Sequence, residues 1–281
     1  MGELEDLVAK TVAIPTIPKA LLRLQEIVAD PNSSLADAVK VVEADPGLAT
    51  RCLKIANSAI YGVRVPRPTL ANAAAVIGMR KLRDLAIQTS LVAKYTHLQQ
   101  QYGFDLGRFW RHCTLTSVAA REIAKKSRAF RAADAEAASA CGLLHNIGRL
   151  VLIDTFKTDY LSVILPVGGR GPAAVQAERE AFGFDHAAVG GLLGTQWNLS
   201  PDIISVAKLH HSRPSDLPSL PQLVGFASQV AHVLIDQGCE PAAPLFTREV
   251  TTLFQIPPGA DREILRALGE GAAVDAAAYA T

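Results

Sequence analysis

Apolar residues recur every three to four positions along most of this chain, and runs that alternate apolar with polar side chains are nearly absent. Leu21, Leu24 and Ile27 show this helical spacing near the N-terminus, and the turn-forming residues at 30–33 end that helix. Such spacing places the apolar side chains on one face of a helix, where neighbouring helices can bury them. The pattern therefore predicts an all-α protein.

Polar residues mark where several helices begin. Ser34 is followed three residues later by Asp37, which resembles a capping box, and Asp45 precedes Pro46 at an expected first helical position. Asp185 stands before a further apolar helical segment. The side-chain oxygens of such residues accept hydrogen bonds from the first backbone amides of a helix, which have no partner inside it. These residues therefore predict three helix N-termini.

The helical segments divide into two groups and a tail. The polar stretch His97–Gln101 follows the first group and precedes a long amphipathic segment, so we expect a domain boundary there. The predicted division is an N-terminal helical subdomain at 1–100, a second helical domain at 101–240, and a C-terminal tail at 241–281. In the tail, one helix is expected at Arg262–Leu268.

The bulk composition excludes several classes of protein. The chain has 281 residues, of which 49% are hydrophobic, so it can fold around one large core or two modest ones. Its 28 Lys and Arg balance 27 Asp and Glu, and a net charge of +1 gives no general attraction for nucleic acid or anionic lipid. Four scattered cysteines form no CxxC pair, and no apolar run reaches membrane-spanning length. We expect a protein of the reducing cytoplasm with no membrane partner.

Histidines on predicted helices are the strongest candidates for chemistry. Five of the seven histidines stand among apolar neighbours on predicted helices, at His112, His145, His186, His210 and His211. A buried neutral imidazole needs a hydrogen-bond partner or a metal ion. A single such residue is usually a satisfied core histidine, but five together favour a shared pocket.

The residue after His145 changes the chemistry that this pocket can support. A His-Asp doublet binds a divalent cation through an imidazole nitrogen and a carboxylate oxygen, and hydrolytic metal centres use such ligands. In this chain Asn146 offers a neutral amide in place of the carboxylate. The doublet therefore has the form of a metal-binding pair without its negative charge.

The order of these histidines resembles the HD superfamily of metal-dependent phosphohydrolases, whose defining doublet is His-Asp followed by Gly-Lys. Within that superfamily, six segments are similar to the HDOD domain, the HD-related output domain of bacterial signalling proteins, and the resemblance covers about residues 10 to 235. These segments are Ala44–Leu48, Leu53–Gly62, Ala74–Gly78, Gly142–His145, Val189–Leu199 and His210–Pro214.

The resemblance implies a helical N-terminal subdomain packed against an HD-like helical bundle, and a role in signal transduction. Several positions depart from the phosphohydrolase pattern: Arg149 stands where that pattern has Lys, Ser212 follows His211 where a carboxylate is expected, and Phe226–Gln229 holds no Asp for the last ligand position. By resemblance, the metal ligands of a weak or vestigial site are His112, His145, Asn146, His186, His210 and His211. No catalytic residue and no cofactor beyond a weakly bound divalent metal is predicted.

Three functions follow as hypotheses. The first is a non-catalytic regulatory module that acts through protein partners of a signalling pathway and through a nucleotide ligand, with a homodimer as an open alternative to a monomer. The second is a weak metal-dependent phosphohydrolase of the HD type. The third, less favoured, is nucleic-acid binding through the basic helix near Arg108–Arg131. The glycine-rich segment Gly168–Gly171 is interpreted as a surface loop or as a cover of the histidine pocket.

Overall fold

The computed structural model describes residues 3–56, 69–131, 134–212, 218–237 and 244–272, and every regular element in these ranges is helical. The predicted all-α fold is therefore confirmed. The chain forms two compact units. Among the described residues, the larger one comprises residues 3–15 and 98–272, and the smaller one comprises residues within 16–97.

The smaller unit is built from the first predicted group of helices. Its helices are α2 (Lys19–Ala29), α3 (Leu35–Glu43), α4 (Pro46–Ala56), α5 (Leu70–Ile77) and α6 (Met79–Tyr95). Leu21, Leu24 and Ile27 are buried, as their spacing requires, and α6 packs against α2, α3, α4 and α5. The capping box of Ser34 and Asp37 is formed, and the Asp45 carboxylate accepts a hydrogen bond from the Leu48 amide at 3.0 Å. The end of the motif Leu53–Gly62, from residue 57, lies outside the described residues.

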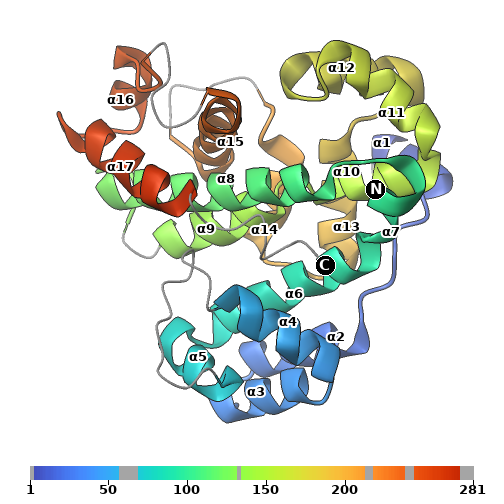
Figure 1. Ribbon diagram of the computed structural model, residues 1–281, viewed down its shortest axis with the longest axis vertical. Coiled ribbons are helices and arrows are strands. Elements are labelled where there is room, and N and C mark those ends of the chain that lie inside the picture. Colours follow the sequence, from blue (N-terminus) through green and yellow to red (C-terminus); the bar gives the residue numbers. More distant parts are fainter. Residues whose placement is uncertain (1–2, 57–68, 132–133, 213–217, 238–243, 273–281) are drawn as a thin grey trace. The chain divides into compact units, whose positions relative to one another are not determined.

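The larger unit is organised around α8 (Leu106–Lys126), which α9, α15 and α17 contact along its length (Figure 1). The other helices of this unit are α1 (Glu3–Thr11), α7 (His97–Tyr102, whose first residue belongs to the smaller unit), α9 (Asp134–Leu144), α10 (Ile147–Phe156), α11 (Thr158–Ile164), η1 (Leu165–Val167), α12 (Gly171–Phe182), α13 (His186–Gln196), α14 (Pro201–Leu209), α15 (Leu220–Gln237), α16 (Arg248–Leu253) and α17 (Ala260–Ala272). Asp185 caps α13 as predicted, because its carboxylate accepts a hydrogen bond from the Ala188 amide.

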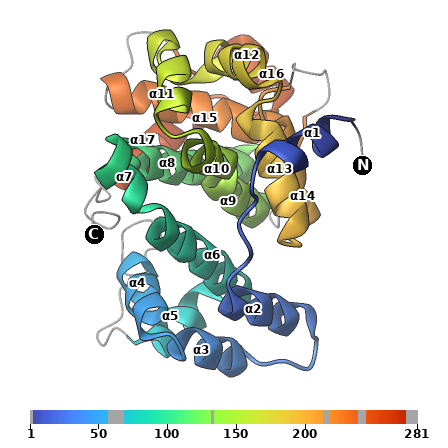
Figure 2. The same cartoon turned by 90° about the vertical axis from the view of Figure 1, so that its right-hand side faces the viewer.

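The N-terminal segment does not group with residues 16–97, although the sequence placed it there. Helix α1 packs against α13 of the larger unit (Figure 2). The indole Nε1 of Trp197, at the end of α13, donates a 2.7 Å hydrogen bond to the carbonyl of Pro15. Because this contact joins residues 182 positions apart, the pattern of the first hundred residues gave no sign of it.

Residues 244–272 also hold more helix than the single-helix tail that the sequence predicted. They contain α16 as well as α17, and α17 packs against α8. Phe254, Ile264 and Leu268 are buried there. The Ser127 hydroxyl donates to the Phe254 carbonyl, and Lys126 pairs with Glu263. Helix α17 packs against α8 because the apolar face of α17 is buried only in that position.

Candidate functional site

Each predicted site residue lies at or near the end of a helix in the larger unit, except His112, which is inside α8. His145 follows α9 directly, Asn146 is the residue before α10, and His186 opens α13. His210 and His211 follow the last residue of α14. All of these side chains are buried apart from that of His211, which is half-buried.

Two glycines allow the helices to approach closely enough to bring these residues together. A Cβ at Gly148 would lie 2.0 Å from the His186 carbonyl oxygen, and one at Gly142 would lie 2.7 Å from the Cα of Ser117. Neither distance is compatible with van der Waals radii. The start of α10 can therefore touch α13, and α9 can touch α8, only because these positions carry no side chain.

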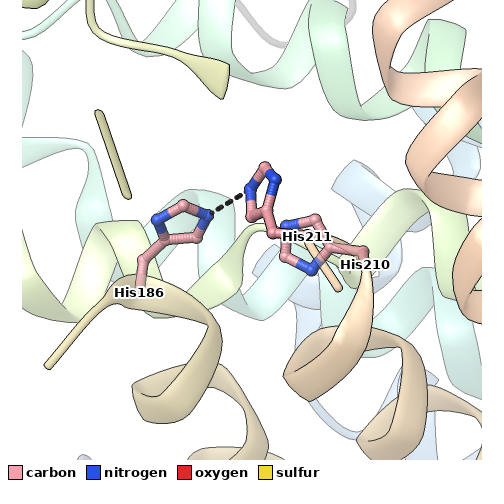
Figure 3. Close-up of side chains that lie close together, drawn as sticks. All are labelled: His186, His210 and His211. Carbon is pink, nitrogen blue, oxygen red and sulfur yellow. Dashed lines mark hydrogen bonds between the residues drawn. The ribbon is translucent and has the colours of Figure 1, made fainter. Parts of the chain in front are cut away.

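The structure brings all five predicted histidines into one continuous cluster. The ring of His145 lies between those of His112 and His210, at centroid distances of 5.3 and 5.0 Å. His210 is followed by His211 at 4.1 Å and by His186 at 5.5 Å. The ligand-capable nitrogens of His186, His210 and His211 all lie within 4.8 Å of one another (Figure 3).

Hydrogen bonds on the outer side of the cluster fix which nitrogen carries the proton. Nδ1 of His145 donates to the carbonyl of Gly142 at 2.8 Å, and Nδ1 of His210 lies 3.1 Å from the carbonyls of Val206 and Ala207. Carbonyl oxygens only accept, so these Nδ1 atoms carry the hydrogen. In the neutral ring the Nε2 lone pair then points into the cluster. Metal-binding histidines commonly have this arrangement.

Two pairs of inward nitrogens are each spaced as two ligands of one metal ion would be. The Nε2 atoms of His186 and His211 are 3.1 Å apart, and those of His112 and His145 are 3.4 Å apart. Two nitrogen ligands at ~2.0–2.1 Å from a tetrahedral ion are separated by roughly 3.3 Å. Among the described side chains, the buried Nε2 of His210 and Oδ1 of Asn146 have no hydrogen-bond partner. The donor set therefore fits a divalent ion that prefers nitrogen ligands, such as Zn²⁺ or Ni²⁺.

Burial keeps four of the clustered histidines uncharged. Removal from water lowers the pKa of His112, His145 and His210 well below the ordinary value, and neighbouring imidazoles lower it further. The same causes lower the pKa of His211 to about 3. Metal ions bind neutral imidazole, so these rings are in the form that a ligand requires.

Helix α15 adds two residues that the sequence analysis missed. The ring of His232 stacks on that of His112 at a centroid distance of 3.9 Å and an interplanar angle of 18°. The Ser228 hydroxyl lies 3.2 Å from His112 Nε2. Ser228 and His232 are four residues apart on one predicted helix, so they share a face. That spacing is the signal in the sequence that could have pointed to this face of the helix.

A buried carboxylate supports the cluster from behind. Glu178 Oε2 accepts hydrogen bonds from the backbone amide and Nδ1 of His186 at 2.8 and 2.7 Å, and Oε1 accepts from the Tyr160 hydroxyl at 2.5 Å. Burial alone would raise the pKa of Glu178, but His186, Arg149 and Tyr160 outweigh it and lower the pKa to about 2. Both carboxylate oxygens are thus engaged away from the inward nitrogens. No sequence pattern marked this residue, since a single Glu on an amphipathic helix is normally exposed.

A cavity of about 310 Å³ lies beside the cluster. His112, Asn146 and His232 line its inner end, and Arg149 lines it as well. The glycine-rich turn is also part of its lining, and Arg149 donates a hydrogen bond to the carbonyl of Gly169. The interpretation of Gly168–Gly171 as a cover of the histidine pocket thus agrees with the lining of this cavity.

Several basic residues of α8 and of the turn after it pair with acidic residues. Some of these partners are distant in the sequence and others are neighbours. Arg108 pairs with Asp236, Lys126 with Glu263, and Arg131 with Asp134. Arg121 and Lys125 share Glu122. These partners reduce the positive field that the sequence suggested along this helix.

The sequence profile of the HDOD domain matches residues 14–213, which is more than half of the chain, and the chain therefore belongs to the HDOD domain family. The expected family is confirmed, together with the helical architecture that it implied.

Comparison with solved structures gives the same fold. An HDOD domain protein of unknown function from Geobacter sulfurreducens is 23% identical, with a TM-score of 0.67 over 94% of this chain and 87% of that one. A protein from Shewanella amazonensis, provisionally named a phosphohydrolase, is 24% identical, with a TM-score of 0.73 over 96% and 95%. A protein from Marinobacter aquaeolei, provisionally named for signal transduction, is 22% identical, with a TM-score of 0.68 over 95% and 58%.

An uncharacterised protein from Treponema pallidum is 27% identical over 233 residues. That region is 79% of this chain but 42% of the Treponema protein, so the chain spans less than half of that relative. Within the described residues, no helix combines the length and the apolar character that crossing a membrane requires.

Proposed function

We propose that this chain is a regulatory protein of a signal-transduction pathway, located in the cytoplasm, which acts through protein partners and a small ligand and does not turn over a phosphoester. One observation carries the proposal: the inward-facing donors of the cluster are imidazoles and the Asn146 amide rather than carboxylates, whereas the buried carboxylate of Glu178 is engaged with His186 and Tyr160. Metal-dependent hydrolases commonly use a carboxylate as a ligand or as the general base that takes a proton from water, and the inward-facing donors named here include none.

The histidine cluster would then hold a divalent ion as a structural or sensory element. His186, His210 and His211 are the best-placed ligands, with His112 and His145 beside them. A bound ion would supply positive charge at the inner end of the cavity. Without an anionic ligand in direct contact with the ion, the affinity should be lower than that of a site with carboxylate or thiolate ligands.

A titration with Zn²⁺ against a chromophoric chelator tests the metal part of this proposal. We expect saturable binding of about one ion per chain in the wild type, and a loss of at least about tenfold in affinity in His210→Ala, which removes one nitrogen ligand. His97→Ala, which changes a histidine outside the cluster, is the matched control. Equal binding by all three proteins would contradict the assignment.

Hydrolysis is the discriminating measurement for the regulatory role. Phosphate release from nucleotides and from a chromogenic phosphodiester should stay at background with Zn²⁺, Mn²⁺ or Ni²⁺ present. Robust turnover that disappears in His145→Ala would overturn the proposal and favour the second candidate, a weak metal-dependent phosphohydrolase. The convergence of Nε2 atoms supports that candidate. Nucleic-acid binding has less support, because the basic residues around α8 have acidic partners.

Asn146→Asp should increase metal affinity. The side chain is buried, and Oδ1 of Asn146 has no hydrogen-bond partner, so a carboxylate there would be a costly charge without metal and a strong ligand with it. We expect Zn²⁺ to bind about tenfold more tightly and to raise the melting temperature more than it does in the wild type. Asn198→Asp, at an exposed position outside the cluster, controls for the added charge. Unchanged affinity would argue against a working metal site.

A further inference from the structure

The cavity beside the histidine cluster has the lining of a binding site for a charged aromatic molecule. Its apolar walls come from α7, α8, α11, η1 and α15, and its aromatic members are Tyr102, Phe104 and Phe109. A volume of about 310 Å³ is in the range of small-molecule sites, which combine mostly apolar walls with a few polar groups. The polar groups therefore decide which class of ligand fits.

Three arginines line this cavity, and they come from three separate parts of the chain. Arg108 belongs to the first turn of α8, Arg149 to α10, and Arg170 to the turn that precedes α12. Asp105 is the acidic residue of the lining, and its carboxylate caps α8 by accepting a hydrogen bond from the Arg108 amide. The lining is thus positively charged. Guanidinium groups hold phosphate oxygens in pairs, which makes arginine the side chain best suited to a phosphate.

The guanidinium groups of Arg108 and Arg170 share one internal anion. Oδ1 of Asp236 accepts a hydrogen bond from Arg108 at 2.5 Å, and Oδ2 pairs with Arg170. The side chains are 53%, 41% and 28% exposed for Arg108, Arg170 and Asp236. Ion pairs as accessible as these contribute little to stability. A ligand with several anionic oxygens can therefore replace the carboxylate at small cost.

The face of α15 that carries Asp236 also carries the residues nearest to the cluster. Ser228, His232 and Asp236 are spaced four residues apart, so they follow one another along one face of the helix. Ser228 contacts His112, the His232 ring stacks on His112, and Asp236 pairs with the arginines. An anion that displaces Asp236 would lie at one end of this row, and the flat His112–His232 pair would lie deeper. This order suits a ligand with a phosphate at one end and a flat ring at the other.

We propose that this cavity binds a nucleotide, with Arg108, Arg149 and Arg170 around the phosphate and aromatic side chains against the base, and that Asp236 occupies two of these arginines when the ligand is absent. The inference deepens the proposed regulatory function by naming the ligand class of the same region, and it rests on that function. Asp236 thereby acts as an internal competitor that sets the ligand concentration at which the protein responds.

Isothermal titration calorimetry with AMP, GMP, adenosine and inorganic phosphate tests this inference on the full chain. We expect at least one nucleotide to bind more tightly than both adenosine and inorganic phosphate, because only the nucleotide fills both parts of the cavity. Binding should weaken as salt increases. The inference would be overturned if neither nucleotide bound detectably at millimolar concentration. It would also be overturned if AMP and GMP both bound no more tightly than adenosine.

Variants separate the roles of the charged residues. Arg170→Ala and Arg108→Ala should each weaken nucleotide binding at least about tenfold, whereas Asp236→Asn should strengthen it several-fold, because it frees the arginines without changing side-chain size. Arg131→Ala and Asp134→Asn make the same charge changes at an ion pair outside the cavity and should leave the affinity unchanged. Weaker binding by Asp236→Asn, or no loss in either arginine variant, would contradict the proposal.

The outcomes distinguish this inference from the proposed function. Zn²⁺ affinity and phosphate release are measured on the same preparations. Nucleotide binding without turnover supports both proposals. Turnover of the bound nucleotide that is lost in His145→Ala overturns the regulatory proposal while it supports the cavity. Absent nucleotide binding in a protein that still binds Zn²⁺ and lacks turnover overturns the cavity alone.

Discussion

Gly148→Ala should lower the free energy of unfolding by about 3 kcal/mol. The added Cβ would lie 2.0 Å from the carbonyl oxygen of His186 and 2.6 Å from the backbone nitrogen of Gly190. These are backbone atoms, so α10 and α13 must separate, and overpacking of this kind costs about 1–3 kcal/mol or occasionally more. Urea unfolding followed by circular dichroism measures the loss.

Gly107→Ala is the matched control for this change. A Cβ at Gly107 would have one neighbour within 4 Å, the Asp105 carboxylate at 3.5 Å, and the residue lies in the first turn of α8. Alanine is favoured over glycine in a helix by roughly 0.5–1 kcal/mol, so this variant should be as stable as the wild type or slightly more stable. If the two variants were equally stable, the close approach of α10 to α13 would be contradicted.

Glu178→Ala should lower the free energy of unfolding by roughly 3–5 kcal/mol, as removal of one partner from a buried charged network generally does. It leaves the amide and Nδ1 of His186 and the hydroxyl of Tyr160 without their acceptor. Each unsatisfied buried donor costs about 1–3 kcal/mol, and relaxation offsets part of that sum. The same urea titration measures the change. Glu180→Ala, on the same helix but exposed, should change stability by no more than about 0.5 kcal/mol.

Glu178→Gln tests the role of the charge with little change in shape. The amide oxygen can still accept from His186, so the fold should survive, but the ring loses an anionic partner that strengthens Nε2 as a ligand. We expect Zn²⁺ affinity to fall about 10- to 100-fold, as it does when an outer partner of a metal-binding histidine is changed. Unchanged Zn²⁺ affinity in a folded Glu178→Gln protein would argue that His186 does not bind metal.

Helix formation was readable from the sequence because it depends on local spacing. The burial of Leu21, Leu24 and Ile27, the capping box at Ser34 and the cap at Asp185 all follow from residues a few positions apart. The family was readable because its motifs are short continuous segments, and the profile match at residues 14–213 confirms it. The gathering of the predicted histidines was inferred from their number and order, and the ring distances agree with that expectation.

Features that depend on distant contacts were not readable. The acidic partners of Arg108 and Lys126 lie 128 and 137 residues away, so the sequence suggested a basic helix where the structure has ion pairs. His232 joins the cluster because α15 lies on α8. The amino acid pattern of α15 does not state which helix covers it.

The sequence by itself determined that this protein is helical, that it belongs to the HDOD family, and that its histidine doublet carries Asn146 where a carboxylate would be needed, since these are properties of continuous segments. Only the tertiary structure decided where the charge lies. Folding buries Glu178 behind His186, places Arg149 on the cavity and joins Asp236 to two arginines, because each of these arrangements depends on how separate segments pack, which no local pattern states.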